Sequence, residues 1–189
     1  AQMEYLRDVQ YPAQLAQLAR QRTILREVMQ DASPERQRTL QNQLFSLSNS
    51  EKAVTGYRSG LTDSTIMARK RAFEADFRRR VTADPQLRAR YGRAWDEIAR
   101  AQRDLGAIAA RRRHYTGSAA GSTLWSLALA SVQLPAEATK PDSARLPAYR
   151  GPALARVRTQ LGQPIPIDRA QERLALAAWL TAAQRELPA

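Results

Sequence analysis

The residues of this chain that could do chemistry are few, and the most unusual of them lie in one segment, Leu44–Leu61, which reads LFSLSNSEKAVTGYRSGL. The segment is predicted to be helical, with Asn49 one turn from Lys52 and the glycines Gly56 and Gly60 one turn apart. Each glycine destabilises a helix interior by about 1 kcal/mol relative to alanine, and asparagine is a middling helix former. Because both glycines share one face, another backbone could approach closely there. Taken alone, the pattern is more typical of a tight helix crossing beside a solvated asparagine.

Catalytic constellations are absent from the sequence. The single histidine, His114, lies in RRRHYTG at a predicted helix end, where a capping or solvated role is usual. The lack of cysteine excludes a thiol nucleophile and a Cys-ligated metal, and no phosphate-binding glycine loop or histidine metal motif occurs. A Ser-His-Asp site would have to use His114, and nothing places a nucleophilic serine beside it. We therefore expect no catalytic residue, no metal and no cofactor in this chain, and no enzymatic activity from it alone.

The composition favours an all-α fold. The 189 residues are enough for one domain with a real core, and 43% apolar with 25% charged residues is ordinary for a globular protein. Ala, Leu, Arg and Gln dominate, whereas long alternating runs of Val, Ile and Thr are missing. We predict one domain over residues 1–189, built as an irregular multi-helix bundle. The most apolar window, Ala119–Leu134, is interrupted by polar residues and is shorter than the ~20 residues that span a bilayer, so we expect no membrane partner.

Capping residues mark where the helices should begin. Starts are predicted at Ser33-Pro34, at Asp63 or Ser64, at Asp84-Pro85 and at Asp168. Pro12 should either kink the first helix or stand in the first turn of a second one, because it lacks the amide hydrogen.

The helices that follow Asp63 and Asp84 show apolar residues at helical spacing. After Asp63 these residues predict a core stripe, which consists of Ile66, Phe73, Phe77 and Val81. After Pro85 they predict one amphipathic helix that ends near residues 111–115, with Leu87, Tyr91, Trp95, Ile98, Gln102 and Leu105 along it.

The residue composition of the chain changes after Tyr115, where small residues and then prolines become frequent. A loop of small residues is expected over 116–122, then a helix over about Thr123 to Gln133. Six prolines crowd the next part, and we predict a largely irregular traverse with one short helix at Ala153–Leu161 before the last helix. The single domain thus has a long-helix bundle over residues 1–115, and small helices with Pro-rich connections over 116–189.

The charge raises a nucleic-acid hypothesis. The formal net charge is +12, and residues 66–113 carry fourteen Lys/Arg against six Asp/Glu. Against the hypothesis, carboxylates stand at helical spacing from several arginines, as in Glu74 with Arg78 and Asp76 with Arg80. The aromatic residues also fall on the predicted core stripe, which leaves few to stack bases. We favour a basic surface that steers acidic partners over a nucleic-acid-binding one.

The pattern Asn49-x-x-Lys52-x-x-x-Gly56-x-x-x-Gly60-Leu61 resembles the helical domain of the bacterial dipeptidyl-peptidase 7/11 family of serine exopeptidases. Other pieces agree in the same order. These are EYLRDVQYPAQL (4–15), ARKRAFEADFRRRVTADPQLRARYGRAWDEI (68–98) and KPDSARLPAYR (140–150).

The resemblance implies a chymotrypsin-type double β-barrel that carries Ser, His and Asp elsewhere in a parent chain, with this helical domain as the cap of its cleft. It implies a peptide substrate whose free amino terminus is held partly by Asn49, while Gly56 and Gly60 let a partner come close. It also implies export to the periplasm or cell surface, although Ala1–Leu6 shows no signal pattern, and it allows a homodimer through the parent protein. Two other hypotheses stay open, a basic nucleic-acid-binding module and a structural helical adaptor.

Overall fold

The structure, a computed structural model, describes residues 2–116 and 121–187, and these residues form helices and connections without a strand. This confirms the all-α prediction. The chain divides into two compact units, Ala1–Arg112 and Arg113–Ala189. The boundary lies close to Tyr115, after which the residue composition changes. Most of the loop predicted over 116–122 lies outside the described residues.

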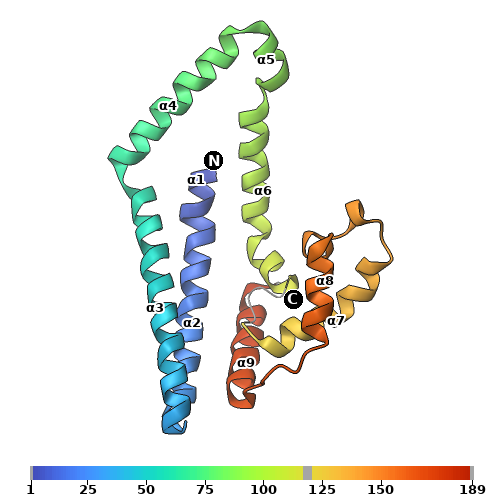
Figure 1. Cartoon of the computed structure of the whole chain (residues 1–189). Coiled ribbons are helices and arrows are strands. Elements are labelled where there is room, and N and C mark those ends of the chain that lie inside the picture. Colours follow the sequence, from blue (N-terminus) through green and yellow to red (C-terminus); the bar gives the residue numbers. More distant parts are fainter. Residues whose placement is uncertain (1, 117–120, 188–189) are drawn as a thin grey trace. The chain divides into compact units, whose positions relative to one another are not determined.

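The first unit begins with a helical segment that changes its geometry before Pro12. Its elements are α1 (Gln2–Tyr5), the π-helix η1 (Leu6–Gln10), α2 (Tyr11–Gln30), α3 (Pro34–Thr62), α4 (Ser64–Ala83), α5 (Pro85–Tyr91) and most of α6 (Ala94–Tyr115) (Figure 1). The amide of Tyr11 donates to the carbonyl of Leu6 in the wide π-type pattern. A proline ring needs room beside the preceding turn, which a wide turn supplies. Pro12 therefore stands in the first turn of α2, as one of the two alternatives predicted.

α2 and α3 pack antiparallel along a seam with the spacing of a coiled coil (Figure 1). Buried and half-buried residues recur there at alternating intervals of three and four: Leu15, Leu18, Arg22 and Leu25 on α2, and Leu40, Leu44, Leu47, Glu51 and Val54 on α3. Leu40 is fully buried. Arg22 and Glu51 form an ion pair across the seam, and the rings of Tyr11 and Tyr57 lie 6.2 Å apart near its end. A polar pair inside an apolar seam specifies the register of the two helices.

The predicted helix starts are confirmed by their caps. The hydroxyl of Ser33 accepts the amide of Arg36. The carboxylate of Asp63 accepts the amides of the second and third residues of α4, and Asp84 does the same for α5. Asp168 accepts the amide of Gln171 at the start of the last helix. Each of these bonds satisfies backbone donors that the first turn of a helix leaves unpaired.

The prediction of one helix from Pro85 to residues 111–115 is wrong, because the chain breaks at Gly92 and Arg93 into α5 and α6. The tight backbone at Gly92 explains the break. A Cβ added there would lie 2.6 Å from the carbonyl oxygen of Arg88, which is closer than real Cβ atoms come to backbone. Only glycine fits this backbone, and glycine is a poor helix former. The apolar spacing of the sequence continues across the break and does not reveal it.

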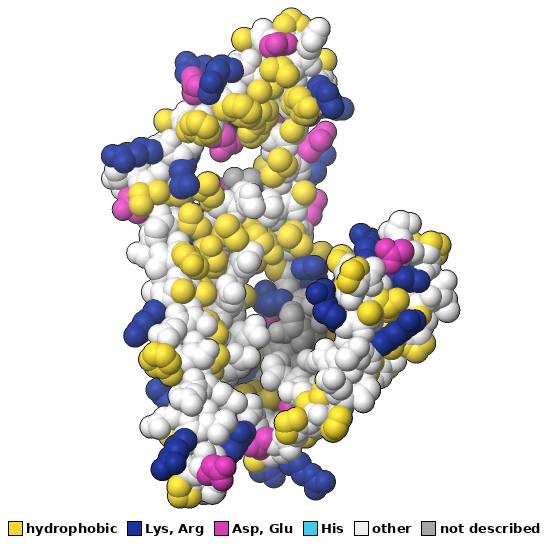
Figure 2. Space-filling view, viewed as in Figure 1, with side chains coloured by type: hydrophobic (Ala, Val, Ile, Leu, Met, Phe, Trp, Pro, Cys, Tyr) yellow, Lys and Arg dark blue, Asp and Glu magenta, His cyan; other side chains and the backbone are white. Residues whose placement is uncertain are grey.

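The core stripe predicted for the helix after Asp63 is also wrong for most of its residues. Val81 is buried, but the exposed fractions are 42% for Ile66, 70% for Phe73 and 47% for Phe77. Leu87, Tyr91 and Ile98 on the following helices are exposed as well. Figure 2 shows hydrophobic side chains at the surface of this part of the first unit. α4 contacts α3 and α5 at its two ends, so its middle has little to pack against beyond Trp95, whose ring is 5.8 Å from that of Phe77.

The second unit contains the last residues of α6, then α7 (Thr123–Ala138), the short 3₁₀ helices η2 (Asp142–Ala144) and η3 (Pro147–Tyr149), α8 (Pro152–Leu161) and α9 (Arg169–Glu186). The irregular traverse and the short helix at 153–161 are confirmed. α7, however, runs past its predicted end at Gln133 and includes Pro135. The guanidinium of Arg145 donates to the carbonyls of Glu137 and Ala138 at 3.0 and 3.3 Å. These bonds satisfy the carbonyls at the end of α7 and so support its extra turn.

Candidate functional site

Asn49 lies on the side of α3 that faces away from α2. It follows the fully buried Leu40 by nine residues, which is a rotation of about 180° from that seam residue at roughly 100° per residue. The predicted helix of the Leu44–Leu61 segment is confirmed as the second half of α3. Because the seam with α2 fixes the orientation of α3, it also fixes the direction in which Asn49 projects.

We name five residues on this side the outer face of α3: Phe45, Asn49, Lys52, Gly56 and Gly60. All are exposed except Gly60, which is half-buried, and the exposed fraction of Phe45 reaches 69%. A Cβ added at either glycine would meet nothing within 4 Å. Within the described residues no second helix lies against the glycines. The close approach expected of them therefore stays a prediction about a partner outside those residues.

The side-chain amide of Asn49 makes no hydrogen bond to any described residue. An asparagine amide offers one carbonyl acceptor and two N–H donors. Nothing in the first unit uses them, so this polar group is free to bind a ligand. Its assigned role in binding the amino terminus of a peptide remains untested by the geometry alone.

His114 is neither solvated nor a helix cap, so the role expected of it is wrong. It is 3% exposed, its Nε2 lies 3.2 Å from an Oε of Glu186, and its ring is 6.0 Å from that of Trp179. Among the described residues, no serine hydroxyl is hydrogen-bonded to its imidazole. The residue belongs to the packing of the second unit and carries no feature of a nucleophilic triad.

Two buried carboxylates that the sequence did not single out organise the second unit. Glu172 is 7% exposed and Glu137 is 4% exposed. Glu137 accepts the ammonium of Lys140 at 2.6 Å and the amide of Leu146 at 2.8 Å. These two hydrogen bonds, that from Lys140 first, lower the pKa of Glu137. The signal was present in the sequence only as a Glu-x-x-Lys pair, which is usually a solvated one.

The ion pairs expected on α4 are present. Arg78 lies 3.9 Å from Glu74, and Arg80 lies 3.0 Å from Asp76. The aromatic part of the argument against nucleic acid is wrong, since Phe45, Phe73 and Tyr57 are exposed.

In the part of the chain that the structure describes, no group of His, Cys, Asp and Glu side chains could hold a metal ion. None of the described helices is both long and apolar enough to cross a membrane.

Comparison with known proteins places the chain in a family. The family model described as Peptidase S46 matches residues 1–189, which is the whole chain. The chain therefore belongs to the peptidase S46 family, that of the dipeptidyl peptidases 7 and 11. No curated protein and no solved structure matches it. The family is one of peptidases, so the all-helical fold and the outer face of α3 must be interpreted as parts of a peptidase.

Proposed function

We propose that this chain is the substrate-gating helical cap of a serine-type dipeptidyl aminopeptidase, and that Asn49 binds the free amino terminus of the peptide. The observation that carries the proposal is the position of Asn49. Its amide is exposed, it has no hydrogen bond to a described residue, and it lies opposite the seam that holds α3 against α2.

The chemistry of an amide suits this role. The carbonyl oxygen of Asn49 can accept a hydrogen bond from a peptide ammonium without the negative charge of a carboxylate. A hydrogen bond to a charged group contributes about 1.5–3 kcal/mol. The coiled-coil seam and its Arg22–Glu51 ion pair hold α3 in one register, so little ordering of the protein would be needed when the peptide binds.

The cleavage chemistry belongs, in this proposal, to a chymotrypsin-like catalytic domain of the same parent chain. The described residues bring no serine beside His114, and this segment by itself should be inactive. The bare glycines Gly56 and Gly60 would then lie where the catalytic domain approaches α3. A periplasmic or cell-surface location is part of the proposal and rests on the family resemblance.

The test is the substitution Asn49→Ala in the complete peptidase, with Asn42→Ala as the matched control. Asn42 is also exposed on α3 and stands two turns before Asn49, on nearly the same side of the helix. We expect Asn49→Ala to lower kcat/KM for dipeptidyl reporter substrates by about 10- to 100-fold, from the hydrogen-bond contribution above. Asn42→Ala should leave the same constant unchanged.

A second substrate makes the test specific for the amino terminus. N-acetylation removes the ammonium, so the acetylated substrate should be a poor one, and Asn49→Ala should change its kcat/KM little. Equal kinetics for wild type and Asn49→Ala would remove the role of Asn49. A gel-shift assay with duplex DNA addresses the nucleic-acid hypothesis, which tight and salt-steep binding near physiological salt would favour.

A further inference from the structure

We propose that the first half of α4 binds acidic residues in the downstream part of substrate polypeptides, beyond the dipeptide that is released. α4 carries two cationic triplets of equal size, Arg69-Lys70-Arg71 and Arg78-Arg79-Arg80. The structure gives them different surroundings, and the difference is what carries the inference.

The second triplet is neutralised by carboxylates. Arg78 lies 3.9 Å from Glu74 and 3.6 Å from Asp96. Arg79 and Arg80 share Asp76, at 2.7 and 3.0 Å. The guanidinium of Arg78 also lies 5.1 Å from the centroid of the Trp95 ring. Three cations therefore face three carboxylates, and this end of α4 presents no net charge to a partner.

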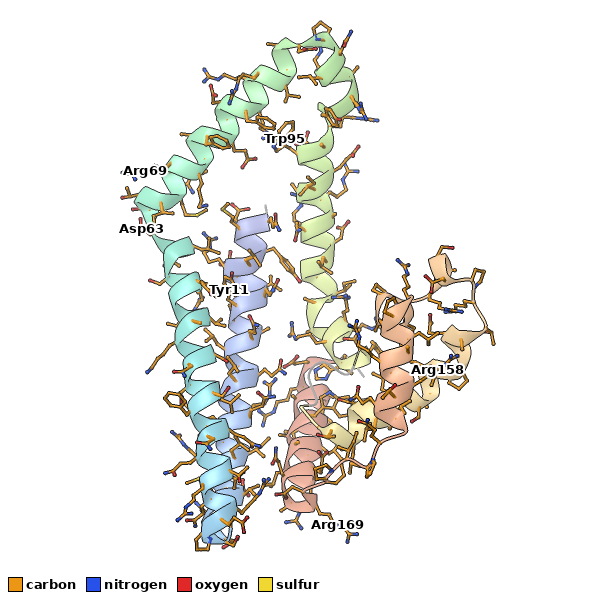
Figure 3. The ribbon with its side chains drawn as sticks, in the orientation of Figure 1. Tyr11, Asp63, Arg69, Trp95, Arg158 and Arg169 are labelled. Carbon is orange, nitrogen blue, oxygen red and sulfur yellow. The ribbon has the colours of Figure 1, made fainter. Side chains whose placement is uncertain are left out.

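The first triplet keeps its charge. All three side chains are exposed, and none of them forms an ion pair or hydrogen bond with a described residue. Glu74 stands within a turn of Lys70 and Arg71 but forms its ion pair with Arg78. Such a pair is stronger when the carboxylate precedes the cation along the helix, as Glu74 precedes Arg78. We call these three residues the bare triplet. Figure 3 shows Arg69 on α4, close to Asp63, where α4 follows α3 (Figure 3).

Exposed apolar side chains flank the bare triplet. Ile66 precedes Arg69 by three residues and Phe73 follows Lys70 by three, so the four lie along one side of the helix. Ile66 is 42% exposed and Phe73 is 70% exposed. A side that combines unpaired cations with an aromatic ring fits an acidic polypeptide that carries apolar residues. It fits nucleic acid less well, because the neutralised triplet further along the helix offers no net positive charge to the continuing phosphate backbone.

The bare triplet lies within reach of a peptide whose first residue is bound at Asn49. This step rests on the proposed function. Thirteen residues of α3 separate Asn49 from Thr62 and six of α4 separate Ser64 from Lys70, which correspond to about 20 and 9 Å of helix. The connection through Asp63 adds at most about 7 Å, so the path is at most about 36 Å, the length of roughly ten to eleven extended residues. Acidic residues about that far along the substrate should contact the bare triplet.

The experiment compares two peptides in the complete peptidase. Both have the same first eight residues and then a block of either four glutamates or four glutamines. At about 0.05 M salt we expect kcat/KM to favour the glutamate peptide by roughly three- to tenfold, and at about 0.5 M salt we expect this preference to vanish. The variant Arg69→Gln/Lys70→Gln/Arg71→Gln should lose the preference, whereas Arg69→Lys/Arg71→Lys should keep it. The variant Arg78→Gln/Arg79→Gln/Arg80→Gln removes the same number of cations and should keep most of it.

The outcomes separate this inference from the proposed function. If Asn49→Ala lowers turnover of both peptides equally and the bare-triplet variant removes the preference, both proposals stand. If Asn49→Ala has no effect while the bare-triplet variant does, the binding of acidic residues stands and the role of Asn49 falls. If both triplet variants lost the preference for the glutamate peptide equally, only the total charge of α4 would matter, and the local site would be overturned. The local site would also be overturned if the bare-triplet variant lost affinity for single-stranded DNA but kept its preference for the glutamate peptide.

Discussion

The carboxylate of Glu172 accepts the hydroxyl hydrogen of Ser122, fifty residues earlier in the chain. The same carboxylate accepts the amide of Thr123 at 2.9 Å and that of Leu124 at 3.2 Å, while the Ser122 oxygen accepts the amide of Trp125 at 2.9 Å. Three amides of the first turn of α7 are thus satisfied by one serine and by one residue of α9. A negative charge at a helix N-terminus is also favoured by the helix dipole. The contact joins α7 to α9.

Replacement of Glu172 by alanine should destabilise the second unit by about 2–3 kcal/mol, because it leaves the buried Ser122 hydroxyl and two helix amides unpaired. Urea unfolding followed by tryptophan fluorescence measures the effect, since Trp125 and Trp179 lie in this unit with their rings 4.1 Å apart. A Trp95→Phe background removes the signal of the first unit. Glu27→Ala, at an exposed position of α2, should change little. A Glu172→Ala variant as stable as the wild type would show that this cap is dispensable.

The lowered pKa of Glu137 predicts how the stability of the second unit depends on pH. The hydrogen bonds from Lys140 and from the Leu146 amide lower its pKa in the folded state below the ordinary value of 4.5. The stability that it contributes is therefore fully present above pH 4.5 and is lost as the pH falls through the lowered pKa.

The variant Glu137→Gln should accordingly be less stable than the wild type at neutral pH, and the difference should shrink in acid. Unfolding free energies measured from neutral pH down to about pH 3 test this, since that range passes below the ordinary pKa of a glutamate. Glu27→Gln serves as the exposed control. A difference between Glu137→Gln and the wild type that is independent of pH would contradict the assignment.

The sequence predicts the helix starts well because capping is local. Ser33, Asp63 and Asp84 accept hydrogen bonds from amides only two or three residues away, so both partners of each bond are neighbours in the sequence. The exposure of Phe73 could not be predicted in this way, because apolar spacing shows that a helix has an apolar side and does not show whether anything covers it. For Asn49, spacing gave its side of the helix, and the family resemblance supplied the role that remains to be tested.

Gly92 yields a prediction about the break between α5 and α6. Gly92→Ala should destabilise the first unit by about 1–3 kcal/mol, because its methyl group would lie 2.6 Å from the Arg88 carbonyl oxygen. Gly106→Ala is the contrasting variant. The added methyl group at Gly106, inside α6, would lie 3.8 Å from a methyl of Val9, which is an ordinary contact, so this change should be neutral or stabilising by up to about 1 kcal/mol. Trp95 fluorescence reports on both. Equal stabilities for the two variants would refute a backbone constraint at Gly92.

Gly56 and Gly60 allow stability and activity to be separated in one experiment. An added methyl group at either position meets nothing within 4 Å in this chain, and alanine is better than glycine in a helix interior. Gly56→Ala and Gly60→Ala should therefore each stabilise α3 by about 0.5–1 kcal/mol. If the outer face of α3 is where the catalytic domain or the peptide comes close, the same variants should lower kcat/KM in the complete peptidase. The control Ala53→Gly, at another exposed position of α3, should destabilise the helix without that loss. Variants at Gly56 and Gly60 that are more stable and fully active would mean that no partner needs the space these glycines leave open.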